Sequence, residues 1–148
     1  MLPEVLKIAT DAKRDGDQRR LATRVVGELG VVNDEVVKLV AATLLQPLDD
    51  TSDEPPLTHN FAIRALGDLG PKALTDDILD RLIALLGTKT VNHQALVMTL
   101  GKLGPKAKKA VPALKAYAAD RGLALSALVA EKILAIEKKQ RNTAPLRP

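Results

Sequence analysis

Hydrophobic residues recur along most of this chain at intervals of three and four positions, the spacing of one face of an α-helix. Glycine, proline and helix-capping Asn, Asp or Thr residues stand between these stretches and mark helix ends. The pattern predicts helices over residues 2–13, 18–29, 34–46, 59–69, 76–86, 93–103, 108–119 and 124–139. Leucine and alanine supply much of the apolar content, and the chain has one Phe, one Tyr and no Trp. This composition favours an all-α fold.

Three of the predicted helices show their buried stripe clearly. The inward-facing positions are Val36, Val37, Val40 and Leu44, then Leu79, Leu82, Leu85 and Leu86, and finally Leu125, Leu128, Val129, Ile133 and Ile136. The last helix also carries a polar rear face, made of Glu131, Lys132, Glu137, Lys138 and Lys139. A polar outer face is what a helix at the end of a stack requires.

One short sequence element occurs three times. It reads L-A-T-R-V-V-G-E-L-G at 21–30, F-A-I-R-A-L-G-D-L-G-P-K-A at 61–73 and A-L-V-M-T-L-G-K-L-G-P-K-A at 95–107. Its G-x-L-G part starts at Gly27, Gly67 and Gly101, in steps of 40 and 34 residues. A weaker fourth copy at 128–136 has no glycine. Self-similarity at this period predicts stacked pairs of helices that share one continuous core.

The repeats organise the chain into one domain over residues 1–140. Its parts are a half repeat at 1–14, repeats at 17–46, 58–87 and 91–120, and a capping helix at 124–139. Residues 1–11 resemble 110–120, the second helix of a repeat, so the chain is expected to begin without the first helix of that pair. Residues 46–57, with two adjacent prolines and four acids, predict an exposed loop. Residues 141–148 are expected to be disordered.

The repeated element resembles the HEAT repeats, most closely the bacterial HEAT-like repeats of the PBS-lyase type. The matching residues are Ala22, Arg24, Gly27, Leu29 and Gly30, then Ala62, Arg64, Leu66, Gly67, Leu69, Gly70 and Pro71, then Leu100, Gly101, Leu103, Gly104 and Pro105, with V-P-A-L at 111–114. The resemblance implies a right-handed α-solenoid of stacked antiparallel helix pairs, whose second helices line a concave binding face. Tetratricopeptide repeats share the 34-residue period but require aromatic residues that this chain lacks.

Composition and charge narrow the functional classes. The chain has no cysteine, which excludes disulfides and thiolate metal sites, and no apolar run approaches the ~18 residues of a membrane span. No signal peptide is evident, and we expect a cytoplasmic protein. The net charge of +4 is uneven: residues 1–57 carry −4, residues 58–87 carry −1 and residues 88–148 carry +9. Such asymmetry can mark an anionic partner for the basic end.

The preferred hypothesis is a non-catalytic scaffold that binds a protein or peptide on the face formed by the second helices. The candidate partner-binding residues are Lys38, Ala41, Asp80, Ala84, Lys109, Ala113 and Ala116. One alternative is binding of nucleic acid or another polyanion by the basic C-terminal half, through Lys102, Lys106, Lys108, Lys109, Lys115 and Arg121. A further alternative is a segment of a larger solenoid, or a chain that self-associates through the apolar flank of its N-terminal helix.

The sequence indicates no catalytic, cofactor-binding or metal site. His59 and His93 stand 34 residues apart and are expected to be solvated residues at helix starts, with no neighbouring ligand pattern. The iron-dependent hydroxylases among HEAT-repeat proteins use His-Glu pairs, and this sequence has no such dipeptide. The acids Asp49, Asp50, Asp53 and Glu54 form either a clip for a basic partner or an insertion without function.

Overall fold

The computed structural model describes residues 1–11, 13–45, 57–89, 91–122 and 124–143, without the side chains of residues 57 and 58. These residues contain helices and no strand, which confirms the all-α fold. The helices are α1 (Leu2–Thr10), α2 (Gly16–Leu29), α3 (Asp34–Leu45), α4 (Leu57–Leu69), α5 (Asp76–Leu86), α6 (His93–Leu103), α7 (Val111–Arg121) and α8 (Ala124–Thr143), with 3-10 helices η1 (Pro71–Ala73) and η2 (Gly104–Ala110). The acids of the predicted 46–57 loop, and residues 144–148, lie outside the described residues.

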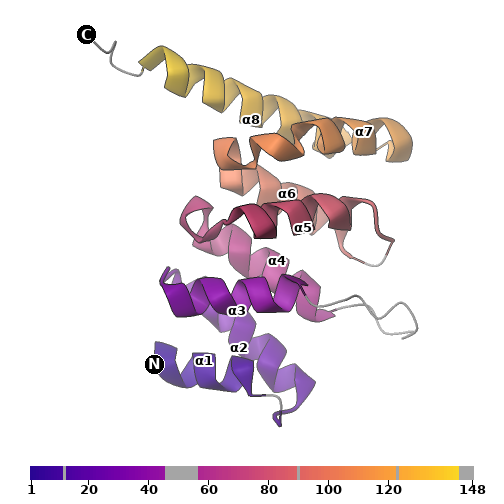
Figure 1. Ribbon diagram of the computed structural model, residues 1–148. Coiled ribbons are helices and arrows are strands. Elements are labelled where there is room, and N and C mark those ends of the chain that lie inside the picture. Colours follow the sequence, from indigo (N-terminus) through magenta and orange to yellow (C-terminus); the bar gives the residue numbers. More distant parts are fainter. Residues whose placement is uncertain (12, 46–56, 90, 123, 144–148) are drawn as a thin grey trace.

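The helices stack in two parallel rows (Figure 1). In the back row α2, α4, α6 and α8 each contact the next, and in the front row α1, α3, α5 and α7 do the same. The helices α1 and α8 lie at opposite ends of this stack (Figure 1). The regular succession of contacts agrees with the periodicity of the sequence, because each pair is too thin to bury its own apolar face.

Contacts between the rows pair the helices differently from the sequence repeats. The closest pairs across the rows are α1 with α2, α3 with α4 and α7 with α8. Each front-row helix therefore packs most closely on the back-row helix that follows it, whereas the sequence repeats join each back-row helix to the front-row helix that follows it. Among the back-row helices, α1 has its closest contacts with α2.

Most helix ends lie where the capping residues predict them. The side chains of Asn92 and Thr75 accept hydrogen bonds from backbone N–H groups in the first turns of α6 and α5. The main error is the helix predicted at 108–119, because residues 104–110 form η2 and α7 begins at Val111. Pro112 explains this, since proline is tolerated only in the first turn of an α-helix. In addition, α1 ends at Thr10 and α8 continues to Thr143, so part of the expected disordered tail is helical.

Glycines of the repeated element hold the back row together. A Cβ added at Gly27 would lie 2.6 Å from the Cα of Ala65 in α4, so these two backbones are in direct contact. The equivalent distance is 2.9 Å from Gly67 to the hydroxyl oxygen of Thr99 in α6, and 3.3 Å from Gly101 to a methyl group of Val129 in α8. The same position of the element thus faces the next helix in all three copies.

The predicted apolar stripes form the core, except at the C-terminal end. The four leucines predicted to face inward from α5 are all buried. Leu128 was predicted to be buried but is 67% exposed, because α8 is the last described helix of the back row and nothing covers its outer side. Glu137 was predicted on the polar rear face, yet its side chain is only 18% exposed and accepts a hydrogen bond from Lys108 of η2.

Candidate functional site

The predicted partner-binding residues all lie in the front row. They come from α3 (Lys38 and Ala41), α5 (Asp80 and Ala84), η2 (Lys109) and α7 (Ala113 and Ala116). Five of them are exposed, whereas Ala41 and Ala113 are half-buried and pack against the core. The structure therefore places these residues along one face of the stack, and the two inner alanines support the core beneath it.

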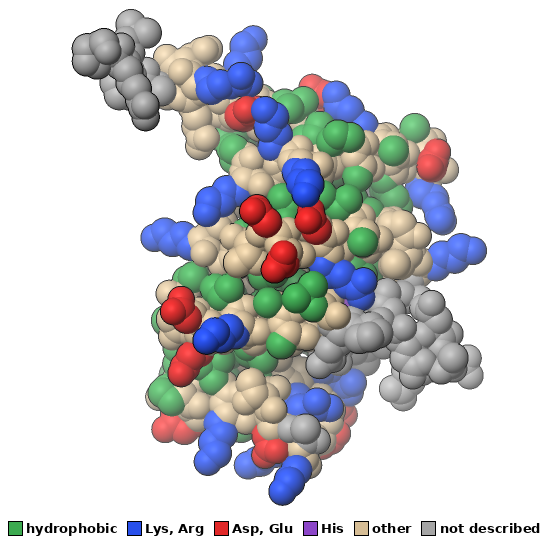
Figure 2. Space-filling view, viewed as in Figure 1, with side chains coloured by type: hydrophobic (Ala, Val, Ile, Leu, Met, Phe, Trp, Pro, Cys, Tyr) green, Lys and Arg blue, Asp and Glu red, His purple; other side chains and the backbone are tan. Residues whose placement is uncertain are grey.

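One ion pair crosses this face. Lys109 Nζ lies 2.5 Å from Asp80 Oδ1, so two of the candidate residues bind each other. The hydrogen bond to Asp80, together with the attraction of its charge, raises the pKa of Lys109 above its ordinary value. Figure 2 shows acidic side chains gathered over α5 in the middle of the face. Asp80, the partner of Lys109, belongs to this same helix.

A groove runs between the first two helices of the front row. It has a volume of about 670 Å³ and lies between α1 and α3, with the start of α2 behind it. Its apolar lining comes from Leu6, Ala9, Leu39 and Ala42. The predicted residue Lys38 stands at its edge. This hollow is the place on the front face where a side chain of a partner can be enclosed.

Three cationic side chains line this groove. They are Lys7, Arg19 and Lys38, and Glu35 is the one acidic group beside them. The Nε atom of Arg19 is buried and has no hydrogen-bond partner among the described residues. A buried donor without an acceptor costs free energy, about 1–3 kcal/mol in typical cases. The guanidinium of Arg19 adds a positive charge to the groove lining beside Lys7 and Lys38, while its Nε is shielded from solvent.

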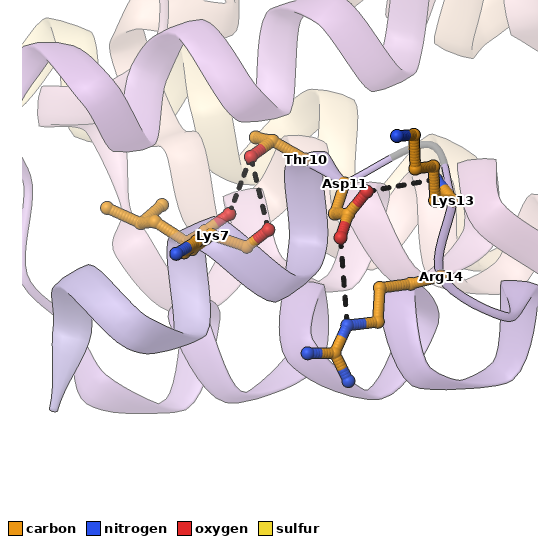
Figure 3. A network of polar contacts seen from close by, with 6 residues as sticks. Lys7, Thr10, Asp11, Lys13 and Arg14 are labelled. Carbon is orange, nitrogen blue, oxygen red and sulfur yellow. Dashed lines mark hydrogen bonds and ion pairs between the residues drawn. The ribbon is translucent and has the colours of Figure 1, made fainter.

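Polar contacts order the end of α1 beside the groove (Figure 3). The carboxylate of Asp11 accepts a hydrogen bond from the backbone N–H of Lys13 at 3.0 Å and lies 3.7 Å from Arg14 Nε. The hydroxyl of Thr10 donates to the backbone carbonyl of Leu6 at 2.9 Å. All of these contacts lie within residues 6–14, so they are local to the last turn of α1 and the residues that follow it.

Most of the predicted polyanion-binding residues have partners within the chain. Five of the six bind groups on four other elements: Lys102 with Asp68 in α4, Lys106 with the Pro71 carbonyl in η1, Lys108 and Lys115 with Glu137 and Glu131 in α8, and Lys109 with Asp80 in α5. Arg121 is exposed at the end of α7. Because these lysines link neighbouring layers of the stack, their arrangement favours a structural role.

The histidines differ from the solvated residues that the sequence predicts. His59, in the first turn of α4, is only 4% exposed. His93 is half-buried and its ring stacks on Tyr117 of α7, with 5.1 Å between ring centroids. The stacking of His93 on Tyr117 could not be predicted from the sequence, because it depends on how α6 and α7 lie relative to each other.

A second hollow lies on the back row between α4 and α6. It has a volume of about 380 Å³ and is lined mainly by polar side chains, among them Arg64, Asp68, Asn92, Gln94 and Lys102. None of the residues predicted for partner binding reaches it.

In the described part of the chain, no three His, Cys, Asp or Glu side chains form a group that could hold a metal ion. Within the same residues, no helix is long and apolar enough to cross a membrane.

Comparisons with protein-family models, with curated proteins and with solved structures found no match to this chain.

Proposed function

We propose that this chain is a non-catalytic, cytoplasmic scaffold that binds a peptide segment of a partner protein on its front face. In this proposal the stacked pairs form a right-handed, HEAT-like superhelix with α1, α3, α5 and α7 on the concave side. The bound segment inserts apolar side chains between α1 and α3 and brings an acidic group to the cations there.

The groove between α1 and α3 is the observation that carries the proposal. Its apolar lining gives a partner side chain a surface to bury, worth roughly 25 cal/mol for each Å² removed from water. The positive charges of Lys7, Arg19 and Lys38 in its lining favour a carboxylate over a neutral group. A site with an apolar body and a few converging polar groups is the usual form of a binding pocket.

Selection from a random-peptide display library tests this function. Peptides selected on the wild-type chain are measured again, by fluorescence anisotropy, on a Lys7→Glu/Lys38→Glu variant. Binding is expected to weaken by at least about tenfold, the factor given by about 1.4 kcal/mol. A Lys132→Glu/Lys138→Glu variant makes the same charge change on exposed positions of α8 and serves as the matched control.

A second comparison asks how far the bound segment extends. An Asp80→Ala/Lys109→Ala variant removes the ion pair over α5 without touching the groove. Loss of affinity in this variant would extend the contact along the whole front face. Selected peptides that bind the Lys7/Lys38 variant as tightly as the wild type would place the binding site elsewhere and overturn the proposal.

A further inference from the structure

In the back row, a glycine of α2, α4 and α6 packs against the helix that follows it in the row. The contacts are Gly27 on Ala65, Gly67 on Thr99 and Gly101 on Val129. In α4 and α6, the receiving residue stands two positions before the glycine that the same helix gives to the next one. The equivalent position in α2 is Val25, two residues before Gly27. No described helix precedes α2 in the back row. Val25 therefore stands where Ala65 and Thr99 stand in their helices, but no glycine of a described helix packs against it.

The surface around Val25 is apolar. Val25 and Leu21 of α2, with Val5 and Ile8 of α1, line a hollow of about 310 Å³, which Arg14 and Gln18 border. Leu21 is 57% exposed, one of the larger exposures of an apolar side chain in the described chain. We name Val5, Ile8, Leu21 and Val25 the end face. The other three side chains are half-buried, and adjoining apolar side chains that stay partly exposed can mark a contact surface.

A second copy of this chain does not offer the helix that the end face fits. Glu131 of α8 stands two positions after Val129, where α4 and α6 have their glycines, and it is exposed and paired with Lys115. A side chain of that size prevents the close backbone approach that glycine allows. Two copies meeting through α2 would oppose Val25 to Val25, again without a small residue on either side.

Charge adds a second requirement. Asp68 and Lys102 each follow the glycine of their helix, and they form an ion pair of 3.1 Å between α4 and α6. Glu28 holds the same position in α2, and among the described residues its ion-pair partner is Arg24 of its own helix, in an exposed pair. Exposed pairs of this kind contribute little, so Glu28 remains available to a cation on a helix that covers the end face.

We propose that the end face binds an amphipathic α-helix of a partner protein, which places a glycine against Val25 and a basic residue beside Glu28. The bound helix continues the back row by one position, with the same contact that α2, α4 and α6 make inside the chain. This site is separate from the groove between α1 and α3, so it stands or fails independently of the proposed front-face function.

A peptide with the sequence of residues 92–106 is the probe, because it contains Gly101 followed by Lys102. A lactam bridge between positions 94 and 98, both exposed in α6, keeps it helical, which circular dichroism verifies. Fluorescence anisotropy is expected to show one peptide bound per chain. Val25→Asp should weaken binding by at least about tenfold, and a Gly101→Leu peptide should bind equally weakly, whereas Lys102→Glu should weaken binding mainly at low salt.

Leu128→Asp is the matched control, since it places the same charge on an exposed apolar residue at the opposite end of the stack. It should leave binding unchanged, and thermal melting should show that both variants fold. A verified helical peptide that does not bind the wild type, or binds Val25→Asp equally well, would overturn the proposal. A wild-type dimer that Val25→Asp converts to a monomer would overturn it in favour of a second copy. The Lys7→Glu/Lys38→Glu variant should bind the probe normally.

Discussion

The contacts of α2 with α4 and of α6 with α8 use the same element of sequence in different ways. Gly27 meets the backbone of α4 at Ala65, whereas Gly101 meets only the side chain of Val129. The α8 end is instead held by side chains: Lys108 and Lys115 bind its two central glutamates, and Ser126 donates a hydrogen bond of 2.6 Å to the Leu114 carbonyl. The residue that receives the glycine, rather than the glycine itself, decides how closely two helices pack.

The largest expected effect comes from Gly27→Ala. The new methyl group would overlap the backbone of Ala65, and overpacking of this kind costs about 3 kcal/mol. Gly101→Ala is the matched variant, because Val129 can adjust and alanine gains about 1 kcal/mol of helix propensity over glycine. Its unfolding free energy should stay within about 1 kcal/mol of the wild type. Urea unfolding of both variants measures the difference, and equal losses would contradict the comparison.

A smaller loss is expected for Thr99→Val. The Thr99 hydroxyl donates a buried hydrogen bond of 3.1 Å to the Ile63 carbonyl in the neighbouring helix, and losing such a bond costs about 1.5 kcal/mol. Thr43→Val is the control, since the buried Thr43 hydroxyl binds the Leu39 carbonyl of its own helix. The control should lose less, because no contact between helices depends on it. Urea midpoints that fall equally in both variants would show that the bond between helices adds nothing.

Glu137→Gln tests the side-chain contacts at the α8 end. The hydrogen bond from Lys108, aided by the charge of Arg141, lowers the pKa of Glu137 below its ordinary value. A lowered pKa in the folded state stabilises the fold above the unfolded-state pKa, about 4.3, and this stabilisation disappears as the pH falls through the folded-state pKa. The variant should therefore melt below the wild type at pH 7, by less than Thr99→Val.

As the pH falls below about 4.3 and through the folded-state pKa of Glu137, the melting temperatures of wild type and Glu137→Gln should converge. The control is Glu131→Gln, which alters the more exposed partner of Lys115 on the same helix. A gap between wild type and Glu137→Gln that persists unchanged at pH 3 would show that the charge of Glu137 is not what stabilises this end.

The smallest effect is expected for the ion pair between Lys109 and Asp80. Both side chains are more than half exposed, and exposed pairs contribute little to stability. A double-mutant cycle with Lys109→Ala and Asp80→Ala should give a weak coupling that vanishes in high salt. A strong coupling that salt does not reduce would contradict the description of this pair as an open surface contact.

Local sequence was sufficient for most of the helices and for the glycine contacts. The core stripe of α5 was predicted residue by residue, because the spacing of its leucines depends only on the helical period. Gly27, Gly67 and Gly101 were recognised as one repeated position, and the structure shows that this position faces the next helix in all three copies. Prediction failed at 108–119, where the restriction that Pro112 imposes on the start of an α-helix was overlooked.

The candidate site was predicted less completely. The sequence placed Lys38 on the front face, but the groove beside it requires α1, which the sequence treats as half of an incomplete repeat. Arg19 was not predicted, because only the packing of α2 behind α1 and α3 brings its guanidinium into the groove. The sequence could not show that Arg19 Nε lacks a hydrogen-bond partner among the described residues, because that depends on which groups surround it after folding.

The sequence by itself determined that this chain is helical, repetitive and joined through glycines, since each of these properties depends on the spacing of residues along one helix. Tertiary structure decided which charges neutralise one another. Lysines that are neighbours in sequence, such as Lys108 and Lys109, bind acids in different helices, α8 and α5. Their partners depend on which helix ends lie within reach of each side chain, and only the stacking of the two rows sets those distances.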